Sequence, residues 1–409
     1  MNEKLSTPLL LDGATGTNLM AAGMPSGVCV EKWVLENPNA IKELQSRFVE
    51  AGSDVVYAPT FSANAAKLGH FGLAGQVAEL NARLVALSKE AVGGRALVAG
   101  DMSPTGLILE PFGDAAFDDV LAIYSEQAEA LKAAGVDLIV CETMLSLAET
   151  RAALLAARRT GLPVLVTVTV DANGRTLFGS DALSCLVVLQ AMGAAAVGLN
   201  CSGGPQPMLP VLERLIPYAC VPVIAKPNAG LPHPDDPTKF DLTPEDMANA
   251  LKKALDMGVS IIGGCCGSTP EHISALRSLL DGCDFAARPE RAAKSDRIAA
   301  NDREIFPLGG YIECSEPVLV TDDLADDLMD AAEDEPDAVA VRLDSPDEAR
   351  ELAMNAHMCT LPLSILSDSP EALETALRLI TGRCVIDSRC SVPFETVRRL
   401  AAEYGALLP

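Results

Sequence analysis

The chain has 409 residues, of which 49% are hydrophobic and 4% aromatic. Lys and Arg number 31 against 56 Asp and Glu, so the formal net charge is -25. The apolar share is enough for a sizeable core, which excludes global disorder. The negative charge disfavours nucleic acid and anionic membrane surfaces as partners, because both would repel this chain.

The first ten residues, MNEKLSTPLL, do not have the pattern of a secretory signal. The longest charge-free stretch, 182–212, is interrupted by glycines and prolines, so we do not expect it to span a membrane. With no export signal, the 12 cysteines predict free thiols or metal ligands rather than disulfides. We therefore expect a cytoplasmic protein.

Up to about residue 280, short apolar runs alternate with longer segments of helical period. Several runs follow a helix that ends in a glycine turn, which is typical of parallel sheets. Eight βα units of this kind predict the α/β class and a closed (β/α)8 TIM barrel. An open doubly wound sheet is less favoured, because no strand precedes a G-x-G-x-x-G turn. The eight predicted strands are 8–11, 54–59, 96–100, 137–141, 163–170, 195–200, 221–226 and 259–264.

A second α/β series is predicted after the barrel domain, which we assign to residues 1–283. Residues 284–305 are charged and alanine-rich, so we predict a helical linker there. Residues 306–409 then form a smaller α/β domain that resembles half a barrel. Its predicted strands are 318–321, 338–343, 361–366 and 384–386.

Three cysteines stand where a barrel places its chemistry, just past the carboxyl ends of strands. Cys201 follows the sixth strand, and Cys265 and Cys266 follow the eighth. The ends of these two strands are about 10 Å apart across two strand spacings, which loops can bridge. Adjacent residues of a strand point to opposite faces, so the pair can share an ion only where the strand has ended. The glycines at 263, 264 and 267 give the backbone the freedom to turn there.

The type and number of these ligands favour one kind of metal chemistry. Three thiolates leave one open position on a tetrahedral zinc ion. Such a site has a net charge of about -1, so it suits binding a fourth thiol better than making hydroxide. The expected reaction is alkyl transfer to a substrate sulfur. A vicinal disulfide between Cys265 and Cys266 is the alternative, and the other cysteines are interpreted as small buried hydrophobes.

Between about residues 5 and 283 the sequence contains six notable segments, LLLDGATGTNL, VVYAPTFSAN, CETM, GLNCSGGP, KPNAG and IIGGCCGSTPEHI. Together they resemble the zinc-dependent homocysteine S-methyltransferases. The closest likeness is to the homocysteine-binding module of cobalamin-dependent methionine synthases, and betaine- and S-methylmethionine-using enzymes share this barrel. The resemblance implies that Cys201, Cys265 and Cys266 hold Zn²⁺ and that the thiolate of L-homocysteine takes the open position. No catalytic group is expected beyond that thiolate.

The resemblance also implies how the rest of the substrate is bound. Asp12 and Glu142 would bind the amino group, and Asn228 would support the site. The turn formed by Gly13, Ala14 and Thr15 can aim backbone N–H groups at the substrate carboxylate. Taken alone, Asp12 is equally consistent with a turn or helix-capping residue. The case for Glu142 is stronger, because a carboxylate after the run DLIVC requires a reason.

Part of the second domain, LPLSILSDSPEALETALRLITGRCVIDS, resembles a fragment of the pterin-binding barrel of methionine synthases. The acidic and amide pterin contacts of that family are not matched, because AVAVRLDS stands where they would be expected. We see no corrinoid-binding segment before Pro409.

The expected activity is methyl transfer to L-homocysteine to give L-methionine, with methylcobalamin on a separate corrinoid carrier protein as the donor. The alternative donor is a small sulfonium or betaine compound. A hypothesis of another class is a non-catalytic thiol-binding or docking module, which the partial pterin-binding-like domain suggests.

Overall fold

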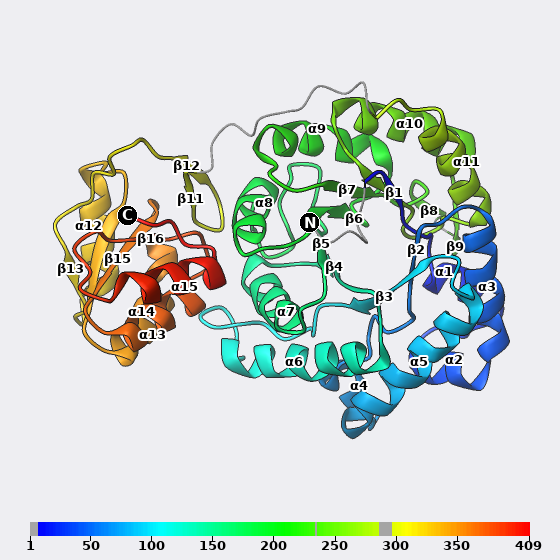
Figure 1. Cartoon of the computed structure of the whole chain (residues 1–409), viewed down its shortest axis with the longest axis horizontal. Helices are drawn as coiled ribbons and strands as arrows, with labels where there is room; N and C mark the ends of the chain where they lie inside the picture. The colour runs from blue at the N-terminus through cyan, green and yellow to red at the C-terminus, as the bar shows by residue number, and fades with distance from the viewer. Residues whose placement is uncertain (1–6, 234, 286–296) are drawn as a thin grey trace.

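The computed structural model describes residues 7–233, 235–285 and 297–409 (Figure 1). Its largest feature is an eight-stranded parallel sheet with the order β1-β10-β7-β6-β5-β4-β3-β2. A bridge between Leu11 and Val55 joins the two end strands and closes the barrel. The predicted (β/α)8 barrel is therefore confirmed. The strands are β1 (Leu9–Leu10), β2 (Val55–Tyr57), β3 (Leu97–Met102), β4 (Leu138–Met144), β5 (Val164–Val168), β6 (Ala196–Asn200), β7 (Val223–Lys226) and β10 (Ile261–Ile262).

The helices around the barrel form where the sequence supplies start and stop signals. α6 has Asp118 and Asp119 in its first turn and ends at Gly135, whose φ is 81°. Ser146 begins α7, and its side chain accepts a hydrogen bond from the Glu149 N–H. The helices are α1 (Gly16–Ala21), α2 (Val30–Glu36), α3 (Pro38–Glu50), α4 (Ala65–Gly69), α5 (Val77–Val92), α6 (Phe117–Ala134), α7 (Leu147–Arg159), α8 (Ala182–Ala191), α9 (Pro205–Leu215), α10 (Pro244–Met257) and α11 (Pro270–Asp281), with 3₁₀ turns η1 (Ala74–Gln76) and η2 (Ile216–Tyr218).

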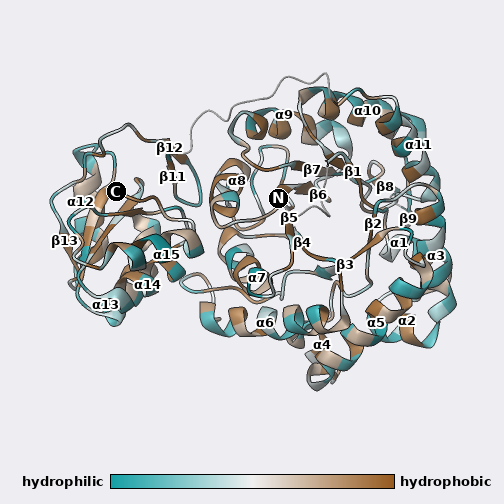
Figure 2. Cartoon of the chain, viewed as in Figure 1, coloured by the Kyte–Doolittle hydropathy of each residue, from teal (hydrophilic) through white to brown (hydrophobic). Residues whose placement is uncertain are grey.

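Two layers of apolar side chains hold the barrel together. One fills the space inside the strands, and the other packs the outside of the strands against the helices. Figure 2 shows hydrophobic strands inside a ring of helices with more hydrophilic outer faces. The filled interior leaves the strand ends and their loops as the place for a site. The inner layer consists of Leu9, Leu11, Val55, Tyr57, Ala99, Leu138, Val140, Leu165, Ala196, Ile224 and Ile261.

A four-stranded parallel sheet with the order β13-β14-β15-β16 forms the C-terminal unit. Its helices alternate with its strands, which confirms the expected smaller α/β part. The elements are β13 (Val318–Leu319), α12 (Leu324–Glu333), β14 (Val339–Leu343), α13 (Pro346–Asn355), η3 (Ala356–Met358), β15 (Leu363–Ser367), α14 (Pro370–Leu379), β16 (Val385–Ile386) and α15 (Phe394–Tyr404).

The prediction of a helical linker is wrong for the part of it that the structure describes. Within 284–305, residues 286–296 lie outside the described part of the chain. The remainder contributes an antiparallel hairpin, β11 (Ile298–Ala300) with β12 (Ile305–Pro307), which packs against α8. The hairpin also bonds to the second unit, because the Ala300 and Arg383 backbones exchange hydrogen bonds. These long-range contacts outweigh the helical preference of the alanines.

Two arginines of α7 link the barrel to the C-terminal unit. Arg151 of α7 is fully buried and donates a 2.6 Å hydrogen bond to the Leu377 carbonyl. Arg158 donates to the Glu403 carbonyl at 3.1 Å. Among the described helices, none is both long and apolar enough to cross a membrane.

Candidate zinc and substrate site

The three sulfurs singled out in the sequence lie together at the carboxyl end of the barrel. The Sγ atoms of Cys201, Cys265 and Cys266 are all within 4.8 Å of one another. Cys201 Sγ and Cys266 Sγ are 3.7 Å apart. Tetrahedral zinc with Zn–S bonds of about 2.3 Å requires sulfurs about 3.8 Å apart. The sulfur cluster therefore has the spacing of a zinc ligand set, with Cys201 and Cys266 partly exposed.

The backbone around the sulfur cluster explains how adjacent cysteines turn to one side. Cys201 directly follows β6 and has a φ of 51°, which is a left-handed conformation. The Cys265 N–H donates to the Pro227 carbonyl at 2.7 Å, so this loop is tied to the end of β7. Gly267 has a φ of 78°. Position 264 requires glycine for a steric reason, because a Cβ there would overlap the Ser268 side chain.

Asn200 links the sulfur cluster to β4. Its side-chain amide donates to Thr143 Oγ1 at 2.7 Å and lies 3.8 Å from Cys265 Sγ. In return, the Thr143 N–H donates to Asn200 Oδ1 at 3.2 Å. The amide is fully buried, and an N–H aimed at a sulfur stabilises the thiolate form. Asn200 is therefore a site residue that sequence reasoning noted only as a strand end.

The proximity of the sulfurs controls their protonation. Hydrogen bonds that Cys201 donates to Cys265 and Cys266 raise the pKa of Cys201 far above its ordinary value. The hydrogen bonds that Cys266 receives lower the pKa of its thiol to about 3. Three thiolates at this spacing repel one another strongly. A divalent cation would offset that repulsion, which is consistent with a metal-ligand set.

A buried group of charges lies beside the sulfur cluster. Lys226 Nζ at the end of β7 is 3.0 Å from Glu142 Oε1 and 4.0 Å from Asp12 Oδ1. All three side chains are at most 9% exposed. Lys226 also lies 4.7 Å from the centre of the Tyr57 ring, and the Tyr57 N–H donates to Asp12 Oδ2. The structure therefore brings Asp12 and Glu142 together, with Lys226 between them.

Asp101 at the end of β3 adds a third carboxyl group to this charge cluster. Burial is the main cause that raises the pKa of Asp101 well above its ordinary value, and the charge of Glu142 raises it further. Burial raises the pKa of Asp12 from 3.8 to about 7 and also raises the pKa of Glu142. Within the described residues, Asp12 Oδ1 and Asp101 Oδ1 have no hydrogen-bond partner. Three acids around one lysine favour binding of a second cation, such as a substrate ammonium group.

The turn of residues 13–15 lies against the sulfur loop, but one of its N–H groups is already engaged. The Ala14 N–H donates to Ser268 Oγ at 3.0 Å. Gly13 is packed against the Phe48 ring, and the Thr15 carbonyl accepts from the Leu19 N–H at the start of α1.

Asn228 lies two residues beyond Lys226 on the loop that contacts the sulfur cluster. Its N–H donates to the Gly203 carbonyl, and the next residue donates to the Cys266 carbonyl. Its side-chain Oδ1 is buried and has no hydrogen-bond partner in the described part of the chain. An amide oxygen in this state is available to a ligand.

Comparison with known proteins identifies the family of the barrel. The family model of the homocysteine S-methyltransferase domain matches residues 9–280. The methionine synthases of Mycobacterium leprae (strain TN) and Mycobacterium tuberculosis (strain ATCC 25618 / H37Rv) are each 29% identical over 97% of this chain. The chain spans 37% of the length of these two relatives.

Solved structures of the homocysteine methyltransferase MmuM from Escherichia coli also resemble the barrel. Its metallated form superposes with a TM-score of 0.56 and 26% identity, covering 66% of this chain and 95% of MmuM. Its oxidized form gives a TM-score of 0.56 and 25% identity, with 68% and 96% coverage. The family model covers more than half of the chain and includes every cysteine of the sulfur cluster. The chain belongs to the homocysteine S-methyltransferase family.

Proposed function

We propose that this chain transfers a methyl group to the thiol of L-homocysteine and produces L-methionine, with Zn²⁺ held by Cys201, Cys265 and Cys266. The observation that carries the proposal is the position of three clustered sulfurs beside a buried, acid-rich charge cluster. The sulfur cluster suits a soft metal and a thiol, and the charge cluster suits an ammonium group. Homocysteine has both groups on one short chain.

The residues of the chain have separate tasks in this reaction. Asp12 and Glu142 bind the substrate ammonium group, and the positive charge of Lys226 opposes the rise in the pKa of Glu142. Asn200 orients Cys265 through its amide. Bound zinc would lower the pKa of the substrate thiol and so supply a thiolate near neutral pH.

The transfer itself is an in-line displacement. The homocysteine thiol releases its proton to water, and its sulfur forms a bond to the methyl carbon while the bond between that carbon and the donor breaks. The electron pair of the broken bond leaves with the donor. The charge cluster holds the substrate so that its sulfur faces the barrel mouth, where the donor approaches.

For the donor, we propose methylcobalamin on a separate carrier protein. The relatives named as methionine synthases support this choice. The loops at the barrel mouth also carry exposed apolar side chains, which are suited to docking another protein. These are Phe61, Leu177 and Leu231. The second candidate is a small sulfonium or betaine donor bound directly in the barrel mouth.

The test uses the purified chain, loaded with zinc, and L-homocysteine. Methylcobalamin, S-methylmethionine and betaine are supplied in separate reactions, and methionine is measured. Formation of methionine from methylcobalamin supports the first donor, and formation from either small donor supports the second. Zinc and homocysteine binding without turnover in any reaction would favour a non-catalytic thiol-binding or docking module.

A further inference from the structure

A cavity of about 220 Å³ lies between the barrel and the C-terminal unit, away from the sulfur cluster. Loops that follow β3, β4 and β5 form its barrel side. The β11–β12 turn, η3 and the segments that lead into β15 and β16 form the other side. Parallel sheets usually bind ligands at the carboxyl ends of their strands. This cavity is at the amino ends of β15 and β16, so it differs from such a site.

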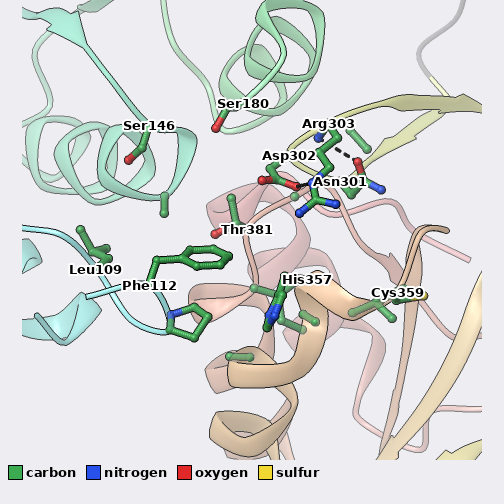
Figure 3. A pocket seen from close by; sticks show the side chains of 18 of the residues that line it. Leu109, Phe112, Ser146, Ser180, Asn301, Asp302, Arg303, His357, Cys359 and Thr381 are labelled. Carbon is green, nitrogen blue, oxygen red and sulfur yellow. Dashed lines mark hydrogen bonds and ion pairs between the residues drawn. The ribbon is translucent and has the colours of Figure 1, made fainter. Parts of the chain in front are cut away.

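The barrel side of the cavity presents aromatic surface. Phe112 is 68% exposed, although it lies next to the second unit. Its ring meets the His357 ring edge to face, with centroids 5.2 Å apart and an interplanar angle of 66° (Figure 3). Phe178, 46% exposed, lines the same cavity. A flat apolar ligand could cover this exposed ring surface and stabilise it.

The other side of the cavity presents a carboxylate and an imidazole nitrogen. Asp302 carries a carboxylate whose distance to Arg303 Nε is 3.9 Å, too long for a hydrogen bond. Burial raises the pKa of Asp302. His357 Nδ1 is buried without a hydrogen-bond partner in the described residues. Figure 3 shows Asp302 and Thr381 beside the space that Phe112 and His357 border.

The backbone holds Asp302 in this position. Its carbonyl accepts a 2.8 Å hydrogen bond from the Asp181 N–H of the barrel. Asn301 Oδ1 accepts from the N–H groups of Arg303 and Glu304, and Asn301 Nδ2 donates to the Thr360 carbonyl. The carboxylate is therefore presented from a fixed turn, which reduces the entropy cost of binding a ligand there.

We propose that this interdomain cavity binds a small planar heteroaromatic molecule that carries an amino group. The ring would stack on Phe112, and the amino group would donate to the Asp302 carboxylate. A ring N–H would satisfy His357 Nδ1. Pockets for drug-sized ligands occupy roughly 300–1,000 Å³, so this smaller cavity suits one bicyclic ring rather than a whole nucleotide.

The binding experiment uses the full zinc-loaded chain and the fluorescent base 2-aminopurine. We expect saturable quenching that adenine reverses, because stacking quenches the base. Purine, which has no amino group, should compete about tenfold less well, the loss expected for one hydrogen bond to a charged group. Homocysteine should not compete. The absence of saturable quenching, or competition by homocysteine, would overturn the proposal.

Matched variants locate the probe. Asp302→Asn and Phe112→Ala should each weaken 2-aminopurine binding about tenfold. Phe394→Ala removes an equally exposed phenylalanine from α15, outside the cavity, and should leave binding unchanged. Thermal unfolding checks that each variant is folded. Wild-type affinity in folded Asp302→Asn and Phe112→Ala would refute the site.

Discussion

Replacing Lys226 by methionine tests the charge cluster directly. Methionine keeps an unbranched side chain of nearly the same length but removes the charge. Lys226 is 3.0 Å from Glu142, and both side chains are buried. Removing one partner of a buried pair costs about 3–5 kcal/mol, because the other charge is left uncompensated. We expect a loss of this size in the free energy of unfolding near neutral pH.

The loss should depend on pH in a defined direction. Burial raises the pKa of Glu142 and of Asp12, and the positive charge of Lys226 opposes this. Without Lys226, both pKa values rise further in the folded state. A carboxyl group with a raised folded pKa favours folding at low pH and opposes it as the pH rises through that pKa. The difference between wild type and variant should therefore be largest above about pH 7 and smaller near about pH 5.

Urea unfolding followed by circular dichroism measures this effect at a fixed zinc concentration. Lys42→Met is the control, because Lys42 is 2.9 Å from Glu90 on the surface and its loss should cost less than about 1 kcal/mol. The double variant Lys226→Met/Glu142→Gln should recover part of the loss, since neither charge remains. Additive effects of the two single changes, or a Lys226 variant as stable as the Lys42 variant, would refute the reasoning.

Three further predictions concern the same site. Cys265→Ala should abolish stoichiometric zinc binding, measured by elemental analysis, while far-UV circular dichroism shows a folded barrel; retained zinc would contradict the ligand assignment. Glu142→Gln should weaken homocysteine binding about 10- to 100-fold in calorimetry, because one charge-assisted hydrogen bond is lost, and unchanged affinity would remove Glu142 from the site. Since the pKa of Asp12 is raised from 3.8 to about 7, wild-type stability should fall as the pH rises through this window, by at most about 4 kcal/mol. Asp12→Asn should flatten that dependence in thermal unfolding, and an equal slope in both proteins would exclude Asp12 as its source.

The barrel could be predicted because its local signals agree with its tertiary structure. Buried parallel strands produce continuous apolar runs, and a glycine such as Gly135 marks the end of a helix before a strand. The hairpin of β11 and β12 could not be predicted in this way. Its strands have three residues each, and they form through contacts with α8 and with Arg383, far away in the sequence.

The sulfur cluster could also be anticipated, because rare residues stood at the ends of predicted strands. A charged residue directly after a buried apolar run is a signal of the same kind. Lys226 stands in this position after PVIA, and Asp101 stands in it after LVAG. Sequence reasoning used this argument for Glu142 and did not extend it to these two. The role of Asn200 could not be read from the chain, because it depends on the approach of Thr143 from another strand.

The left-handed backbone of Cys201 has a consequence for how an ion is captured. An L-residue in this conformation costs about 1–2 kcal/mol relative to the right-handed helical region. The fold around Cys201 offsets that cost. In the proposed zinc site, Cys265 lies on a loop that is hydrogen-bonded to the end of β7, so coordination has little backbone left to order. We expect a rigid site of this kind to release zinc to a chelator at a lower rate than a flexible peptide with the same three thiols.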